Sequence, residues 1–163
     1  AAANDGLSWW EYNSGTDSYD EQEIDATFTG ASSIYLIDFD NDGDMDVLAA
    51  SNELNEVAFY KNNGDGSAWE KVVIDSDFDG ASAIYAADLD DDGDMDVVGA
   101  AENDGIAYWD NDGDVNNWAN SRNEIDSSFT GAVDVAAADM NGNGSVDVVA
   151  VNATEAAWWD LAE

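Results

Sequence analysis

The sequence predicts an all-β protein made of similar antiparallel sheets of four strands, repeated along the chain. Three observations support this prediction. Acidic runs begin at Asp38, Asp88 and Asp139, which are 50 and 51 residues apart. The apolar stretches between these runs are short, rich in β-branched and aromatic residues, and bounded by Gly, Asn and Asp. With 45% hydrophobic residues, including seven Trp, the 163-residue chain has the material for a core and is not a disordered acidic tail.

The repeat extends beyond the acidic runs. In each period a Phe-x-Gly-Ala segment precedes the acidic run, and an aromatic pair follows it. The segments occupy residues 28–31, 78–81 and 129–132. The aromatic pairs are Trp9-Trp10, Phe59-Tyr60, Tyr108-Trp109 and Trp158-Trp159, and an isoleucine recurs at Ile24, Ile74 and Ile125. So many features in the same register indicate a true internal repeat.

Within the second period, four β-like runs follow one another. They lie at residues 84–87, 97–100, 105–109 and near Glu124-Ile125, and the acidic run separates the first two. Four strands in a period of about 40–50 residues are typical of β-propeller blades. Adjacent aromatics on the third strand point to opposite faces. A strand that is apolar on both faces is expected where a sheet is sandwiched between neighbouring blades.

These repeats predict a single repeat domain over residues 1–163, in four parts. Residues 1–26 form a partial blade with strands three and four, 27–77 and 78–128 form one blade each, and 129–163 form an incomplete blade with strands one to three. Propellers usually have about four to eight blades, so three repeats are not expected to close alone. We therefore expect head-to-tail self-association into a ring or a filament. The alternative is that the chain is a fragment of a larger propeller.

The composition excludes several classes of function. Three basic and 38 acidic residues give a formal net charge of −35, which repels nucleic acid and anionic membranes. The absence of Cys excludes a disulfide framework, and the absence of His removes the commonest general base and the usual zinc ligand. No apolar run approaches the length of a membrane span. We expect no nucleic-acid partner and no membrane insertion, whereas cations suit this charge.

Each acidic run carries oxygen donors at alternate positions, as a calcium-binding loop does. In the second run, Asp stands at positions 1, 3, 5 and 9, Gly93 at position 6 permits a sharp turn, and the carbonyl of position 7 is a further donor. Carboxylates this close repel one another unless a cation lies between them. The predicted metal ligands are Asp38, Asp40, Asp42, Asp44 and Asp46 in the first loop, Asp88, Asp90, Asp92, Asp94 and Asp96 in the second, and Asp139, Asn141, Asn143, Ser145 and Asp147 in the third.

Calcium is the predicted ion, at up to three sites. An EF-hand is excluded because position 12 is Ala49, Gly99 or Ala150 instead of Glu, and because a strand follows. Zinc is disfavoured without His or Cys, and Mg²⁺ prefers fewer protein ligands. The third loop has two fewer carboxylates among its ligands than the second, so we expect it to bind more weakly. The acidic turn at residues 110–114 is interpreted as hairpin turn chemistry, as is the turn at 62–66.

With these motifs identified, the chain resembles the FG-GAP/VCBS-type repeats of β-propellers, as found in integrin α-subunit heads and secreted microbial proteins. The resemblance lies in Asp-x-Asp-x-Asp-Gly-x-x-Asp at 38–46 and 88–96, in a degenerate copy at 139–147, and in the Phe-x-Gly-Ala segments. It covers almost the whole chain, although the Gly-Ala-Pro ending is absent and such propellers have more blades. The resemblance implies structural calcium between the first two strands of each blade, and roles in adhesion, glycan binding or support of a catalytic domain.

The predicted function is that of a non-enzymatic, extracellular, calcium-binding structural or adhesive protein that self-associates. Asn152, in Asn-Ala-Thr, is a predicted glycosylation acceptor. One alternative is a glycan-binding, lectin-like module, for which Trp69 and Trp118 are expected to be exposed because their surroundings resemble loops. Another is a polysaccharide-active enzyme with a carboxylate pair. The enzyme is disfavoured because no acidic pair stands out from the repeat.

Overall fold

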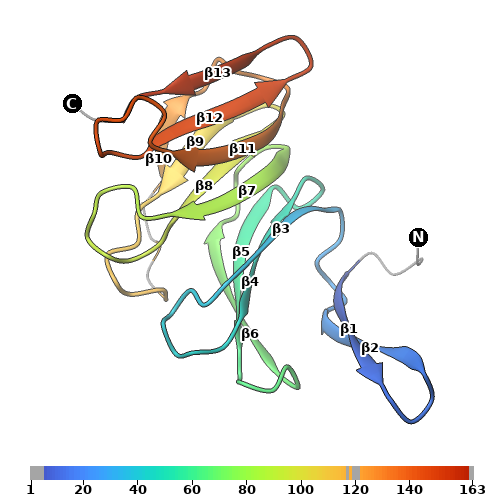
Figure 1. The fold of residues 1–163 in the computed structure, drawn as a ribbon. Helices are drawn as coiled ribbons and strands as arrows, with labels where there is room; N and C mark the ends of the chain where they lie inside the picture. The colour runs from blue at the N-terminus through green and yellow to red at the C-terminus, as the bar shows by residue number, and fades with distance from the viewer. Residues whose placement is uncertain (1–5, 117, 119–121, 162–163) are drawn as a thin grey trace.

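The computed structural model describes residues 6–116, 118 and 122–161. Within this part of the chain, thirteen strands form four antiparallel sheets of two to four strands, which follow one another along the sequence (Figure 1). No helix among the described residues is long and apolar enough to cross a membrane. The predicted all-β fold of repeated, blade-like sheets is confirmed.

Each sheet keeps its strands in chain order. The first sheet is a hairpin of β1 (Leu7–Asn13) and β2 (Ser18–Asp25). The second contains β3 (Ala31–Ile37), β4 (Asp46–Ser51), β5 (Glu56–Asn62) and β6 (Trp69–Asp75). The third contains β7 (Ala81–Ala87), β8 (Asp96–Ala101), β9 (Gly105–Trp109) and β10 (Arg122–Asp126). The fourth contains β11 (Ala132–Ala138), β12 (Asp147–Asn152) and β13 (Ala156–Trp159).

The strand registers show which parts of a blade the two outer sheets represent. Trp9 lies opposite Gln22 in the β1–β2 hairpin, as Phe59 lies opposite Val72 in β5–β6. The hairpin therefore corresponds to the third and fourth strands of a blade. At the other end of the chain, β13 pairs with β12 in the register that β5 keeps with β4. Both β1 and β13 are thus third strands.

The core lies between successive sheets, which stack face to face. One cluster of buried side chains, including Phe59 and Trp109, fills the space between sheet β3–β6 and sheet β7–β10. A second cluster, including Ile106 and Val148, lies between sheet β7–β10 and sheet β11–β13. Every residue of β4 and β8 is buried because both strands are interior to their sheets and are covered on both faces. This arrangement explains why the strands are apolar on both sides.

An edge-to-face aromatic contact recurs in every repeat. The phenylalanine of each Phe-x-Gly-Ala segment meets the second aromatic residue of the third strand in the same sheet. The pairs are Phe28–Tyr60, Phe78–Trp109 and Phe129–Trp159, with ring centroids 5.7, 5.0 and 5.2 Å apart. Perpendicular rings at this distance are favourable because the positive edge of one ring meets the negative face of the other. The two motifs therefore recur together because they pack on each other.

A hydrogen bond from an aromatic side chain ties each sheet to the next. Asp25, the last residue of β2, accepts a bond of 2.9 Å from the Tyr60 hydroxyl. Asp75, the last residue of β6, accepts one of 3.0 Å from Nε1 of Trp109. Sequence reasoning missed these aspartates, although each directly follows one of the repeated isoleucines. The hairpin β1–β2 therefore contacts sheet β3–β6 as a preceding blade does.

Trp118 is buried, and the expectation that it is exposed was wrong. The residue is only 5% exposed, and its ring stacks on Phe39 with centroids 5.9 Å apart. Its Nε1 donates a hydrogen bond of 2.7 Å to the carbonyl oxygen of Val115. The indole belongs to the core cluster between the two sheets, which its polar neighbours in the sequence do not reveal.

Candidate metal centre

The first and second acidic loops each bring three carboxylates together. The first loop, residues 38–46, joins β3 to β4, and the second, residues 88–96, joins β7 to β8. In each loop the acids at positions 1, 3 and 5 offer oxygen atoms that all lie within 4.8 Å of one another. These acids are Asp38, Asp40 and Asp42 in the first loop and Asp88, Asp90 and Asp92 in the second. We call each group a triad.

The two loops share one backbone conformation. Positions 4 and 6 have positive φ in both: 58° at Asn41 and 99° at Gly43, and 63° at Asp91 and 97° at Gly93. Gly adopts this left-handed region freely, and Asn and Asp tolerate it better than other residues do. In both loops the N–H of the position-6 glycine donates a bond of 3.1 Å to the carboxylate at position 1. The turn therefore directs the alternate carboxylates inward.

One oxygen in each triad is buried without a hydrogen-bond donor. Oδ1 of Asp38 and Oδ1 of Asp88 have no partner among the described residues. Leaving a buried anionic oxygen unpaired is costly, because the group loses its hydration and gains nothing in return. A cation in the triad would satisfy this atom. Oxygen donors alone, with no His or Cys, are the ligands of a hard ion such as Ca²⁺.

The aspartates at position 9 fasten each loop to the end of the third strand. Asp46 and Asp96 are fully buried. Four backbone N–H groups donate to them at 2.8–3.0 Å, those of Phe39 and Asn62 to Asp46 and those of Leu89 and Asn111 to Asp96. Burial raises the pKa of Asp96 to about 6, although these bonds oppose the shift. In the structure, the position-9 aspartates anchor each loop through these backbone hydrogen bonds. Their role as metal ligands stays a prediction.

The side chains at position 7 lie beside the turns that follow the third strands. The carboxylates of Asp44 and Asp94 face the turn glycines Gly64 and Gly113. A methyl group built on either glycine would come within 2.9 and 3.0 Å, respectively, of a carboxylate oxygen. These positions therefore leave only their backbone carbonyls for the predicted ion. The turns themselves are held by Asn62 and Asn111, whose side chains accept bonds from backbone N–H groups, in agreement with hairpin turn chemistry.

In the third loop, residues 139–147, backbone N–H groups of the loop itself donate hydrogen bonds to the first aspartate. Oδ1 of Asp139 accepts a bond of 2.6 Å from the N–H of Gly142, and Oδ2 accepts one of 3.0 Å from Gly144. The Gly144 bond is the main cause of a lowered pKa at Asp139. Asp139 is exposed, so this loop does not hold a buried, unpaired oxygen at position 1.

The other predicted ligand residues of the third loop also form hydrogen bonds. Nδ2 of Asn141 donates to Asp160 at 3.1 Å, and the N–H of Ser145 donates to Oδ1 of Asn143 at 2.8 Å. Asp147 is fully buried, but only one of its oxygens accepts a backbone bond and Oδ1 has no partner among the described residues. No three acids gather in this loop within the described chain. Weaker binding at the third loop stays a prediction.

Asn152, the predicted glycosylation acceptor, ends β12. Its Nδ2, the atom that would carry a sugar, donates a bond of 3.3 Å to the carbonyl oxygen of Thr130. Its Oδ1 accepts bonds from the N–H groups of Thr154 and Glu155 at 2.9 and 3.0 Å. Glycosylation at this residue stays a prediction, and it would weaken the contact with Thr130.

The comparisons with known proteins agree with this architecture. Residues 38–99 and 88–150 each match the FG-GAP-like repeat. Each match begins at the first aspartate of an acidic loop and ends in the second strand of the following sheet. No curated protein and no solved structure gives a significant match to the chain. Because the two matches together cover residues 38–150, more than half of the sequence, the chain belongs to the FG-GAP-like repeat family.

Proposed function

We propose that this protein is an extracellular, calcium-binding structural or adhesive module. The observation that carries the proposal is the buried, unpaired Oδ1 of Asp38 and of Asp88 within two matching triads. Ca²⁺ takes six to eight oxygen ligands at about 2.3–2.6 Å. Each triad, the carbonyl at position 7 and water would supply them. The role proposed for the ion is to hold the β3–β4 and β7–β8 hairpins in shape.

A structural role suits the acids better than a catalytic one. The acids that gather follow the internal repeat, and both triads have the same geometry. Catalytic pairs are expected to depart from such symmetry, because one reaction needs one site. Extracellular calcium-binding modules work with dissociation constants of about 10⁻⁴ to 10⁻³ M. Surface loops with modest affinity are therefore adequate outside the cell.

Calcium titration by isothermal calorimetry tests the metal proposal. We expect the wild-type protein to bind Ca²⁺ at the first two loops. The variants Asp42→Asn and Asp92→Asn should each weaken one site at least tenfold, because each removes a triad carboxylate. Glu11→Gln, at an exposed residue of β1 that lies opposite Asp20 in the β1–β2 hairpin, removes the same charge away from the loops and should leave binding unchanged. Wild-type protein that takes up no calcium would contradict the proposal.

Self-association is the second part of the proposed function. The first observation that supports it is an uncovered apolar face on β3. Ile34 of β3 is 56% exposed, whereas its counterpart Ile84 of β7 is only 4% exposed. Ile84 belongs to the buried cluster that also contains Leu48 and Phe59 of sheet β3–β6, so that sheet covers it. Figure 1 shows β3 and β7 in neighbouring sheets. Leu36 and Met45 are exposed beside Ile34. We call these three residues the leading face.

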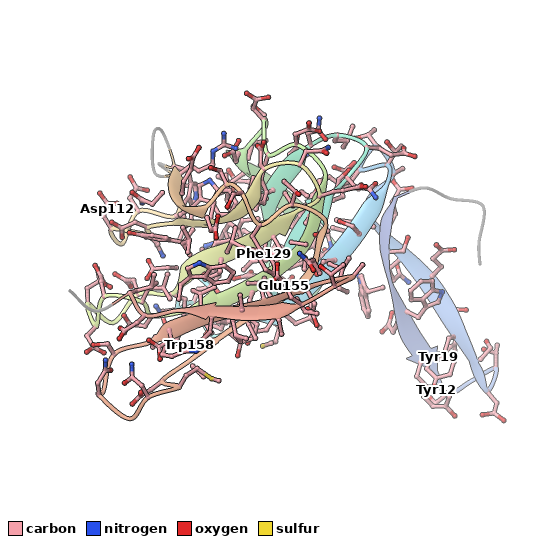
Figure 2. The ribbon with its side chains drawn as sticks, turned by 90° about the horizontal axis from the view of Figure 1, so that it is seen from above. Tyr12, Tyr19, Asp112, Phe129, Glu155 and Trp158 are labelled. Atoms are coloured by element: carbon pink, nitrogen blue, oxygen red, sulfur yellow. The ribbon has the colours of Figure 1, made fainter. Side chains whose placement is uncertain are left out.

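The opposite end of the stack has a matching uncovered face. Trp158 of β13 is 48% exposed, whereas its counterpart Phe59 of β5 is 0% exposed. Val133 and Met140 are also exposed on sheet β11–β13. Figure 2 shows Trp158 well away from Tyr12 and Tyr19, which lie near the tip of the β1–β2 hairpin. We call Val133, Met140 and Trp158 the trailing face.

The contact between sheets β3–β6 and β7–β10 indicates what covers both faces. There, the side of β3–β6 that carries Phe59 covers Ile84 of β7. A second copy of the chain offers the same two kinds of surface, so we propose that its trailing face covers the leading face of the first copy. Because β1 of the first copy already holds the third-strand place there, β13 of the second copy must displace it. Such a head-to-tail contact is heterologous and builds rings or filaments. Within the described residues no further strand pairs with β1 or β13, which leaves an open edge on each.

Mixing two blocked variants tests this contact. Leu36→Glu blocks the leading face, and Trp158→Glu blocks the trailing face. Each variant alone should stay monomeric in calcium, whereas an equimolar mixture should form heterodimers, because each partner keeps the other face. Analytical ultracentrifugation measures the species. A mixture that stays monomeric while the wild type assembles would rule out the head-to-tail arrangement.

Glycan binding is a second candidate function, favoured by one groove. A space of about 390 Å³ between the hairpin and sheet β3–β6 is lined by Trp9, Ile24, Leu36 and Trp69, among others. Indole faces in such a groove suit the apolar faces of sugars. If the groove binds glycans, Trp69→Ala should lose binding on a sugar array while ultracentrifugation shows unchanged assembly. Loss of assembly without any sugar binding would favour the head-to-tail contact instead.

A further inference from the structure

One of the three basic residues departs from the repeat. Lys71 and Arg122 occupy matching places, since Lys71 lies 3.6 Å from Oδ2 of Asp25 and Arg122 lies 3.5 Å from Oδ2 of Asp75. Both cations therefore support the bonds that tie one sheet to the next. Lys61 has no basic counterpart in the other repeats. Its location must be explained separately.

Lys61 lies at the first triad. It follows Tyr60 on β5, and its Nζ contacts Oδ2 of Asp40 and lies 3.2 Å from Oδ2 of Asp42. These contacts raise the pKa of Lys61. They also help to lower the pKa of Asp42, after the larger contribution from the N–H of Asp44. The ammonium group therefore brings a positive charge to two of the three carboxylates that would hold a metal ion.

The second loop has an acid where the first has this lysine. Asp110 follows Trp109 as Lys61 follows Tyr60. The pKa of Asp110 is raised by burial and then by the negative charges of Asp90, Asp92 and Asp112. The N–H of the next residue, Asn111, donates to Asp96 of the second loop, as the N–H of Asn62 donates to Asp46 of the first. Asp110 therefore places a carboxyl group at the strand end where the first loop has the ammonium group of Lys61. The two loops are alike in backbone and in predicted ligands, and the second carries one further acid at position 4, where Asp91 replaces Asn41. Residues 61 and 110 add a second electrostatic difference in the same direction.

Lys61 leaves one oxygen of the first triad without a partner. Oδ1 of Asp38 stays buried and unpaired although the lysine binds the other two acids of the triad. A divalent ion would satisfy that oxygen, but it would be repelled by the ammonium group beside Asp40 and Asp42. The lysine must then withdraw toward solvent before the ion binds fully. Its contacts thus compete with the metal without replacing it.

We propose that Lys61 is an internal competitor for calcium at the first loop and that Asp110 strengthens the second loop. This inference rests on the proposed calcium binding. The inference predicts the order in which the sites fill: calcium binds at the second loop at lower concentrations than at the first loop. It also assigns the loops different behaviour without metal, because the lysine neutralises part of the first triad whereas the second triad has no cation of its own.

Calcium titrations of single-residue variants test the proposal, with Ca²⁺ alone as the probe. We expect Lys61→Met to bind calcium roughly tenfold more tightly at the first loop, and Asp110→Asn to bind roughly tenfold more weakly at the second. Lys71→Met is the matched control, because it removes the same charge away from both loops and should leave both affinities within about twofold of wild type. Combining each variant with Asp42→Asn or Asp92→Asn assigns the affinity to a loop.

Hydrogen exchange in chelator gives a second measurement that does not depend on bound metal. The amides of Gly43 and Asp44 should exchange faster in Lys61→Met than in wild type, because the triad has lost its cation. Suppose that the wild-type protein binds calcium at both loops, but that Lys61→Met and Lys71→Met show the same calcium affinities and the same amide exchange. That result would overturn the role of Lys61 as a competitor and leave the calcium proposal intact. Wild-type protein that binds no calcium would overturn both.

Discussion

The first and second acidic loops form a natural comparison, because they share a ligand pattern but differ in charge at position 4, Asn41 or Asp91, and at the neighbouring strand end, Lys61 or Asp110. Both have the same positive φ angles, the same glycine hydrogen bond and the same buried, unpaired oxygen. The third strand then places Lys61 beside one triad and Asp110 near the other. Two loops with the same motif therefore have different electrostatics. The difference shows that a ligand motif fixes the geometry of a site, while a neighbouring strand sets the charge that an ion meets.

The third loop extends the comparison to a loop whose first aspartate already accepts hydrogen bonds from the loop backbone. Asp139 is satisfied by the N–H groups of Gly142 and Gly144, and two asparagines replace acids of the other loops. The three loops thus form a series: a triad with an added acid, a triad with a lysine, and a loop held by its backbone. We expect the need for an external cation to fall along this series.

Metal removal should produce the largest effect. Calcium at about a thousand times its dissociation constant adds about 4 kcal/mol to the free energy of unfolding, and EGTA should remove this contribution. Hydrogen exchange should then show that amides of β7 and β8 lose more protection than those of β3 and β4, because only the first triad retains a cation. Equal loss of protection in both sheets would contradict the difference drawn between the loops.

Removal of a position-9 aspartate should rank next. Asp96→Ala leaves the N–H groups of Leu89 and Asn111 without their acceptor, and each buried unsatisfied donor costs about 1–3 kcal/mol. We expect a total loss of about 3 kcal/mol in urea unfolding, measured in chelator so that metal does not contribute. Asp147→Ala is the matched variant in the third loop, where one carboxylate oxygen accepts a single backbone bond, so its loss should be smaller. A larger loss for Asp147→Ala would reverse this ranking.

Substitution of the position-6 glycines should have the smallest effect, and an equal one in both loops. Gly43→Ala and Gly93→Ala each place a side chain at positive φ, which costs about 1–2 kcal/mol. No atom lies within 4 Å of the added methyl group at either site, so the cost comes from the backbone alone. Unfolding in chelator should therefore give matching values. Clearly unequal values would mean that the loops differ in backbone as well as in charge.

The sequence by itself determined the repeat, the four strands of a blade and the acidic loops. These features depend on local rules: alternation along a strand, turn residues at strand ends, and glycine where φ must be positive. The four runs expected in the second period correspond to β7, β8, β9 and β10. The gathering of the acids at positions 1, 3 and 5 was equally predictable, because they lie within a single turn.

Only the tertiary structure decided how distant residues meet. Lys61 reaches Asp40 because the C-terminal part of β5 and the loop after β3 lie at the same end of one sheet. Trp118 is buried because it packs in the core between two sheets. Gly99 stands where the preceding repeat has Ala49, because a methyl group there would lie 2.7 Å from Trp109. The physical reason is common to all three. Spacing along the chain governs local conformation, whereas packing and charge depend on residues brought close by the stacking and pairing of strands.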